Sequence, residues 1–170
     1  MKYEDYITNV PNFPIEGIQY KDITPLIGNG KAFKAAVQEL SAFAKAQGAT
    51  VIIGPDARGF IVGCPVACEL ELGFVPVRKP GKLPREVLEY DYSLEYGKNT
   101  LCIHKDAIKA NDKVVIMDDL LATGGTIQAT VKMVEELGGE VVGIGFFIEL
   151  VDLNGRDKIK DYPIKVLIQY

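Results

Sequence analysis

The chain has 170 residues, of which 48% are hydrophobic and 25% charged, and its net charge is −4. This length fits one domain with a sizeable core, and an acidic chain lacks the general basic surface of nucleic-acid-binding proteins, so a bound anion needs a local site. The sequence shows no secretory signal and no apolar run near the roughly 20 residues that span a bilayer. We therefore expect a single-domain cytoplasmic protein without nucleic-acid or membrane partners.

Helical and strand patterns alternate from about residue 31 onward. Apolar residues from Phe33 to Ala44 follow the 3.6-residue period of a helix, whereas Thr50–Gly54 is a short run rich in β-branched residues, as in buried strands. The predicted elements are helices over 31–47, 59–72 and 124–137 and strands over 50–54, 74–78, 113–117, 141–150 and 164–168. This order predicts an α/β fold whose mainly parallel central sheet is flanked by helices, with ligands beyond the carboxyl ends of the strands.

The segment Gly54–Phe60 joins a predicted strand to a predicted helix start. Backbone amides at such a junction face an anion favourably. Arg58 adds a planar fork suited to a diphosphate, although a cation is poorly placed at a helix N-terminus unless a ligand is present.

Residues 79–100 interrupt the regular pattern with prolines, glycines, charges and tyrosines. They indicate a long loop or a small hairpin, and long loops in compact domains are usually functional. Arg78, Lys79, Lys82 and Arg85 open this segment, and in an acidic protein they could close over a diphosphate and exclude water.

A second strand-to-helix junction carries the most distinctive residues. Asp118 and Asp119 follow the strand over 113–117, and a loop of small residues then opens the next helix. The backbone amides of this loop, the helix start and two threonine hydroxyls can hold a phosphate monoester, while the carboxylates can accept hydrogen bonds from ribose hydroxyls. The loop residues are Ala122, Thr123, Gly124, Gly125 and Thr126.

Other motifs that bind nucleotides or metals are missing. The sequence has no Walker-type GxxxxGK[ST] loop, and Gly143-Ile144-Gly145 lacks the third glycine of a dinucleotide fingerprint. Three cysteines without CxxC spacing and a single histidine favour neither a disulfide framework nor a zinc site. We expect Cys64 and Cys68 to be small buried hydrophobic residues and His104 to lie at the surface.

The segment Asp118–Thr126, Asp-Asp-Leu-Leu-Ala-Thr-Gly-Gly-Thr, resembles the phosphoribosyl diphosphate binding motif of the type I phosphoribosyltransferases, in the spelling of their adenine-specific branch. Further stretches that resemble this branch are Phe13–Leu26, Ala57–Phe60 and Tyr92–Lys98. The resemblance covers nearly the whole chain. It implies a purine salvage enzyme that joins adenine to 5-phospho-α-ribose 1-diphosphate and releases AMP and diphosphate, with Mg²⁺ held mainly by substrate oxygens.

The resemblance also assigns roles along the chain. Residues 1–30 would form a small hood over the base, residues 79–100 a mobile loop, and two copies a homodimer. Glu95 would be the general acid or base, with Asp118 and Asp119 orienting the ribose. Ile18, Gln19 and Lys21 would bind the base mostly through backbone groups, and Phe60 could pack on its ring. Diphosphate-binding residues would be Ala57, Arg58, Arg78, Lys79 and Lys82, with a cis peptide at Asp56-Ala57, although Pro80 stands where the family often has a basic residue.

Two alternatives stay open at this point. One is a phosphoribosyltransferase for hypoxanthine, guanine or xanthine, because the residues that contact the base edge are hard to identify from the sequence. The other is a non-catalytic regulator that kept the ligand-binding fold. Such regulators usually carry an added DNA-binding domain, for which this chain has neither room nor a basic surface.

Overall fold

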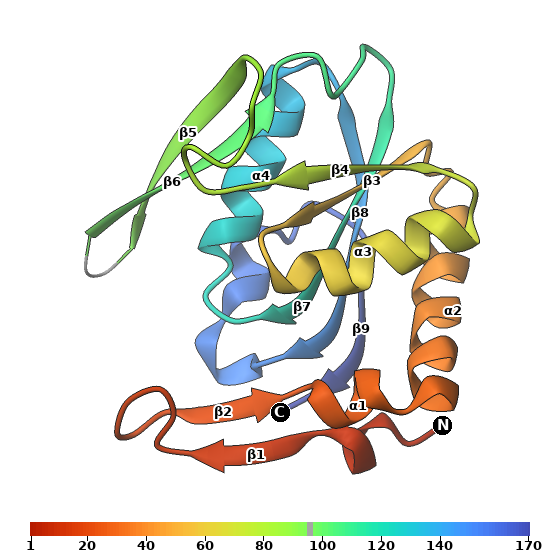
Figure 1. Cartoon of the computed structure of the whole chain (residues 1–170), viewed down its shortest axis with the longest axis vertical. Helices are drawn as coiled ribbons and strands as arrows, with labels where there is room; N and C mark the ends of the chain where they lie inside the picture. Colours follow the sequence, from red (N-terminus) through yellow and green to blue (C-terminus); the bar gives the residue numbers. More distant parts are fainter. Residues whose placement is uncertain (95–96) are drawn as a thin grey trace.

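The computed structural model describes residues 1–94 and 97–170 of an α/β protein (Figure 1). The strands are β1 (Thr8–Pro11), β2 (Gln19–Asp22), β3 (Val51–Pro55), β4 (Gly73–Val77), β5 (Val87–Leu94), β6 (Gly97–His104), β7 (Lys113–Leu121), β8 (Glu140–Glu149) and β9 (Ile164–Gln169). The helices are α1 (Thr24–Gly28), α2 (Gly30–Ala46), α3 (Arg58–Glu69) and α4 (Gly125–Glu136), with short 3₁₀ helices η1 (Tyr3–Tyr6), η2 (Val151–Leu153) and η3 (Gly155–Lys158).

Five strands form the central sheet in the order β4-β3-β7-β8-β9, and every neighbouring pair is parallel. Successive side chains of β7 enter opposite faces: Val114 and Ile116 join one core, Val115 and Met117 the other. The first core is covered by α4 and the second by α2 and α3. The predicted parallel sheet flanked by helices is confirmed.

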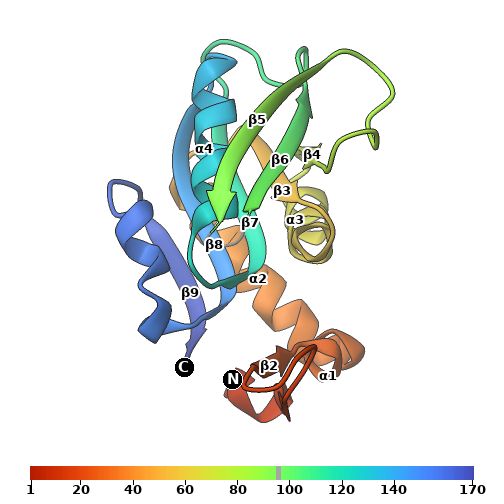
Figure 2. The same cartoon turned by 90° about the vertical axis from the view of Figure 1, so that its left-hand side faces the viewer.

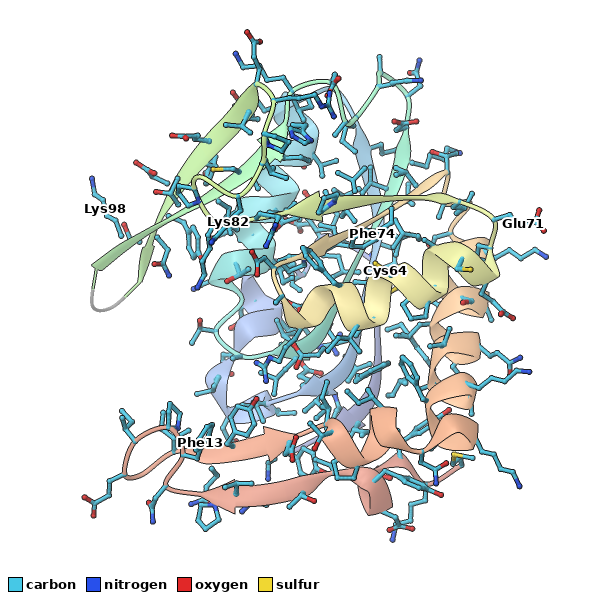
Figure 3. All side chains as sticks on the ribbon, in the orientation of Figure 1. Phe13, Cys64, Glu71, Phe74, Lys82 and Lys98 are labelled. Atoms are coloured by element: carbon cyan, nitrogen blue, oxygen red, sulfur yellow. The ribbon has the colours of Figure 1, made fainter. Side chains whose placement is uncertain are left out.

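The N-terminal segment forms a separate layer. β1 and β2 pair antiparallel, and together with α1 they lie across the end of the molecule to which β8 and β9 point (Figures 1 and 2). The ring of Phe13, in the connection between the two strands, packs edge-on against Tyr20 with centroids 5.1 Å apart (Figure 3). The hood predicted for residues 1–30 therefore lies at the carboxyl end of the sheet. Its role in base binding stays a prediction.

The segment predicted as a loop or small hairpin contains a long hairpin. β5 and β6 pair antiparallel from Val87–His104 to Leu94–Gly97. Side chains of Leu88, Tyr90 and Tyr92 pack against the core beneath α4, so this part is less loop-like than its polar composition indicated. Glu95, the predicted acid or base, lies outside the described residues.

Two sequence-based expectations are wrong. β7 continues to Leu121, where the sequence predicted an end at Met117, so both acids lie within the strand. Cys64 and Cys68 are exposed, because Val62 and Val66 supply the buried stripe of α3, and Cys64 points away from that stripe (Figure 3). None of the helices in residues 1–94 and 97–170 is long and apolar enough to cross a membrane.

Candidate active site

The two strand-to-helix junctions meet at one cavity of about 250 Å³. The first junction contributes Asp56, Ala57 and Arg58, and the second contributes residues 118–127. All seven residues predicted to bind ribose and phosphate line this cavity, together with two of the residues predicted for the diphosphate. The structure thus brings together two sequence segments that lie about 60 residues apart.

The loop between β7 and α4 is shaped by glycine. Gly124 has φ +79°, a left-handed conformation that is strained for other residues, and it directly precedes the first turn of α4. A Cβ at Gly124 would lie 2.6 Å from the carbonyl oxygen of Gly155, and a Cβ at Gly155 would lie 2.1 Å from that of Ala122. Two glycines therefore let the segment after β8 pack directly against the loop. The amides at the start of the 12-residue helix α4 line the cavity together with this loop. We call residues 122–126 the anion cradle.

The junction between β3 and α3 approaches the acids closely. The Asp56-Ala57 peptide bond is cis, as the resemblance implied. A Cβ at Gly59 would lie 3.1 Å from Oδ1 of Asp118 and 2.7 Å from Cδ of Pro55. Only a residue without a side chain lets α3 begin this near to β7. Gly59 therefore sets how closely the start of α3 approaches Asp118.

Arg58 spans the cavity wall between two parts of the chain. Its Nε lies 3.2 Å from Oδ2 of Asp119, and its Nη1 donates a hydrogen bond of 2.6 Å to the hydroxyl of Tyr20 in β2. Oδ2 of Asp119 is buried and, among the described residues, has this ion pair but no well-aligned hydrogen bond. The guanidinium therefore connects the hood to the acids. A ligand with better acceptors, such as a phosphate, could form bidentate hydrogen bonds with it instead.

The acidic pair is more buried than the sequence indicated. Asp119 is only 2% exposed, although the sequence placed both acids at the mouth of the strand. Burial, followed by the charge of Asp119, raises the pKa of Asp118 well above its ordinary value. Burial also raises the pKa of Asp119, and the nearby guanidinium of Arg58 opposes this shift. Two adjacent acids that are hard to ionise together suit a role in hydrogen bonding to sugar hydroxyls.

The predicted cations after β4 do not line the cavity. Arg78 approaches it indirectly: its Nε donates to Oδ2 of Asp56 at 3.1 Å, and its guanidinium carbon lies 5.8 Å from the ring centroid of Phe60. Lys79 and Lys82 are exposed. Their contact with a diphosphate stays a prediction.

The predicted base-binding residues also lie outside the cavity. The side chains of Gln19 and Lys21 bind Asn9 on the neighbouring strand, at 2.8 and 3.0 Å, and Ile18 is 43% exposed. Phe60 packs edge-on against Phe74 with centroids 5.6 Å apart. Within the described residues, the hood contacts the site through the hydroxyl of Tyr20. Contact between the base and the backbone of Ile18, Gln19 and Lys21 stays a prediction.

Sequence reasoning missed several residues at the site. Asp56 and Tyr20 hold the two arginines, and the hydroxyl of Tyr92 lies 3.1 Å from Oγ1 of Thr126 in the anion cradle. Asp56 stood inside a motif singled out from the sequence but received no role. Both tyrosines also stand in stretches that resemble the family, but their partners could not be predicted, because each partner lies more than 30 positions away.

Comparison with known proteins identifies the family. The model of the phosphoribosyl transferase domain matches residues 26–169. The crystal structure of adenine phosphoribosyltransferase from Thermoanaerobacter pseudethanolicus is 50% identical with a TM-score of 0.96, covering 99% of this chain and 98% of that one. The enzyme from Rhodothermus marinus is 46% identical with a TM-score of 0.93, covering 99% and 96%.

A third structure carries ligands. Adenine phosphoribosyltransferase from Saccharomyces cerevisiae, complexed with an imino-altritol bisphosphate and adenine, is 36% identical with a TM-score of 0.92, and the match covers 98% of this chain and 96% of that one. The family match spans most of the chain, and each of these relatives exceeds 30% identity over nearly its full length. The chain therefore belongs to the phosphoribosyltransferase family, among its adenine phosphoribosyltransferases.

Proposed function

We propose that this protein transfers the 5-phosphoribosyl group of 5-phospho-α-ribose 1-diphosphate to adenine, giving AMP and diphosphate for purine salvage. The observation that carries the proposal is the cavity in which the anion cradle and the acidic pair of β7 meet the junction at Ala57 and Arg58. The anion cradle suits the 5′-phosphate, the acidic pair suits the ribose hydroxyls, and the junction with Arg58 suits the diphosphate. Family membership supports adenine as the base.

Each part of the cavity has a separate task in this proposal. The amides and hydroxyls of residues 122–126 hold the 5′-phosphate, and Asp118 and Asp119 accept hydrogen bonds from the ribose hydroxyls. Arg58 leaves Asp119 to bind the diphosphate, which offers it a doubly charged acceptor. As the bond from C1′ to the diphosphate oxygen breaks, N9 of adenine attacks C1′. Holding both partners in line supplies much of the rate, and the acids stabilise positive charge that develops on the ribose.

Proton transfer at the purine is assigned to Glu95 on the resemblance alone. It follows β5 directly in the sequence, in the segment proposed to close over the substrates together with Lys79 and Lys82. A carboxyl that takes up or returns the purine proton as N9 attacks would act in the transition state, where such groups contribute most.

Mg²⁺ fits the site as an ion held mainly by the substrate. Among the described residues, no cluster of three or more His, Cys, Asp or Glu side chains forms a metal site, and the cavity offers only a few carboxylate oxygens, from Asp56, Asp118 and Asp119. Mg²⁺ beside phosphates commonly keeps its waters and takes one or two protein carboxylates. When bound, the ion would neutralise charge on the leaving diphosphate.

We also propose that the protein works as a homodimer. The outward side of α3 carries Ile61, Cys64 and Pro65, which are exposed or partly exposed and form an apolar surface. Contact between two copies through α3 would place Lys79 and Lys82 near the partner's cavity.

The test of the function is turnover with each purine base. Purified protein is incubated with 5-phospho-α-ribose 1-diphosphate, Mg²⁺ and either adenine, hypoxanthine, guanine or xanthine. We expect adenine to react at least tenfold faster than any 6-oxopurine, which corresponds to about 1.4 kcal/mol of discrimination in the transition state. Equal turnover with hypoxanthine would contradict the choice of adenine. Absence of turnover with every base would contradict catalysis itself.

A further inference from the structure

The hydroxyl of Tyr92 touches the anion cradle from outside. It lies 3.1 Å from Oγ1 of Thr126, a distance at which either oxygen can donate a hydrogen bond. Tyr92 belongs to β5, which runs alongside α4, whereas Thr126 belongs to the first turn of α4 and lines the cavity (Figure 2). The bond therefore joins the hairpin to the cradle across a sequence separation of 34 residues.

The chemistry of the two hydroxyls favours one of them as the donor. A threonine hydroxyl has one proton and two lone pairs, and it can give that proton to a phosphate oxygen only if the protein does not also claim it. A phenol is the better donor of the two because it is the stronger acid. Donation from Tyr92 to Oγ1 of Thr126 fixes the threonine rotor and leaves its proton for the cavity. Hydrogen bonds arranged in such a chain also strengthen one another.

We propose that Tyr92 is a positioning residue for the phosphate subsite: its O–H donates to Oγ1 of Thr126 and aims the Thr126 proton at the 5′-phosphate of the substrate. The inference rests on the proposed function insofar as the cradle holds that phosphate. The same bond ties β5 to the cradle three residues before Glu95 in the sequence, so an occupied cradle holds this strand in place.

Tyr90 provides a matched control for this role. It lies two residues earlier on the same face of β5, and its ring is half-buried beside Gln128 and Ala129 of α4. Its hydroxyl makes no hydrogen bond to a side chain of the cradle among the described residues. A general effect of losing a tyrosine hydroxyl from this hairpin should therefore appear in both variants, whereas positioning of Thr126 should be lost in one only.

The experiment compares Tyr92→Phe and Tyr90→Phe in the full-length protein, with ribose 5-phosphate as the calorimetric probe and AMP formation as the kinetic one. Tyr92→Phe should weaken ribose 5-phosphate binding and raise KM for 5-phospho-α-ribose 1-diphosphate by about threefold to tenfold, the loss expected for one hydrogen bond. The KM for adenine should stay within about twofold of wild type, and the thermal midpoint within about 2 °C, which is roughly the scatter of neutral substitutions. Tyr90→Phe should match wild type.

A double-mutant cycle with Thr126 separates positioning from a structural effect. In the Thr126→Val background, Tyr92→Phe should cause no further loss, because its target hydroxyl is gone. Unchanged or tighter binding in Tyr92→Phe would overturn the inference, as would a full Tyr92→Phe effect in the Thr126→Val background. Wild-type protein that turns over adenine while Tyr92→Phe is unaffected contradicts only the inference. Wild-type protein that neither binds ribose 5-phosphate nor forms AMP contradicts the proposed function and the inference with it.

Discussion

At the scale of single residues, the site keeps two carboxyl groups in a buried environment that disfavours their ionised form. Asp118 and Asp119 are adjacent in a buried strand, and their pKa values are raised by burial, although Arg58 partly offsets this for Asp119. Such an arrangement costs folding free energy and is retained where substrate hydroxyls need strong acceptors. The ion pair and the hydrogen bond of Arg58 limit that cost before substrate arrives.

Asp118→Asn should separate stability from activity. Because the pKa of Asp118 is raised on folding, the folded state binds more protons than the unfolded state between about pH 4 and the raised value, so stability falls as pH rises through that window. The amide removes this penalty. We expect the thermal midpoint at pH 7 to rise by about 2–4 °C, while AMP formation falls by about tenfold to a hundredfold through the lost charged acceptor.

Thermal scans at pH 7 and pH 4 check the Asp118→Asn prediction, with Asp152→Asn as the control at an exposed aspartate. The two midpoints of Asp118→Asn and wild type should converge at pH 4, where the native carboxyl is protonated. A variant that is less stable than wild type at pH 7 and fully active would contradict both the burial effect and the ribose role.

Glu95→Gln tests the proposed acid or base. The substitution keeps the size of the side chain and its hydrogen-bonding capacity but removes the titrating carboxyl. We expect the chemical step to slow by about 10²-fold, the usual range for a lost acid or base, with little change in substrate binding. Product release can limit turnover and hide such a loss, so the measurement is a single-turnover rate. An unchanged rate would remove Glu95 from the mechanism.

At the scale of elements, the long helices and all five central strands could be predicted from the sequence, but the end of β7 could not. The helix predicted over 31–47 is observed as Gly30–Ala46, because its apolar period and the glycine after it are local signals. The true end of β7 was hidden, since Asp118 and Leu121 extend the strand by pairing with Phe146 and Glu149 of β8. Ladder pairing between distant strands overrides the local preference of an aspartate for turns.

The same limit applies to the site. Both strand-to-helix junctions could be predicted, because small residues, acids and a helix start stand together in the sequence. The segment after β8 could not, since Gly155 has no local motif and meets Ala122 only in the fold. The bidentate ion pair that holds this segment, from Arg156 to the buried Glu149 at 2.9 and 2.6 Å, is likewise visible only in three dimensions.

Gly155→Ala should displace the backbone of the anion cradle. Its Cβ would lie 2.1 Å from the carbonyl oxygen of Ala122, so the backbone of either segment must move. We expect ribose 5-phosphate to bind about tenfold to a hundredfold more weakly, since displacements near 1 Å at a preorganised site have effects of this size. Gly73→Ala is the control, because a Cβ there meets no atom within 4 Å. Calorimetry showing wild-type affinity in Gly155→Ala would contradict the buttressing role of this segment.

At the scale of the whole molecule, two outer layers flank the central sheet. The hood lies across the carboxyl ends of β8 and β9, and the β5–β6 hairpin lies beside α4 (Figures 1 and 2). Among the described residues, Arg58 links the hood to β7 through Tyr20 and Asp119, and Tyr92 links the hairpin to α4 through Thr126. Both outer layers are therefore connected to the site by polar side chains.

The outward face of α3 makes assembly testable at the same scale. Cys64 is exposed there beside the partly exposed Ile61 and Pro65, and an apolar helix face of this kind suits an isologous contact between two copies. Sedimentation at micromolar concentration should show a dimer. Cys64→Arg should shift it towards monomer, since two buried cations would face each other across the symmetry axis. Gln38→Arg adds the same charge on the exposed side of α2 and should leave the dimer intact.

The kinetic consequence of the dimer distinguishes a functional contact from a merely structural one. If Lys79 and Lys82 of one copy serve the partner's cavity, Cys64→Arg should raise KM for 5-phospho-α-ribose 1-diphosphate at low protein concentration, and concentrating the variant should restore it by mass action. Mixing the weakly active Asp118→Asn protein with a Lys79→Ala/Lys82→Ala protein should then recover part of the lost affinity in mixed dimers. A wild-type protein that sediments as a monomer while fully active would contradict the assembly, and mixed dimers without any recovery would contradict the shared cations.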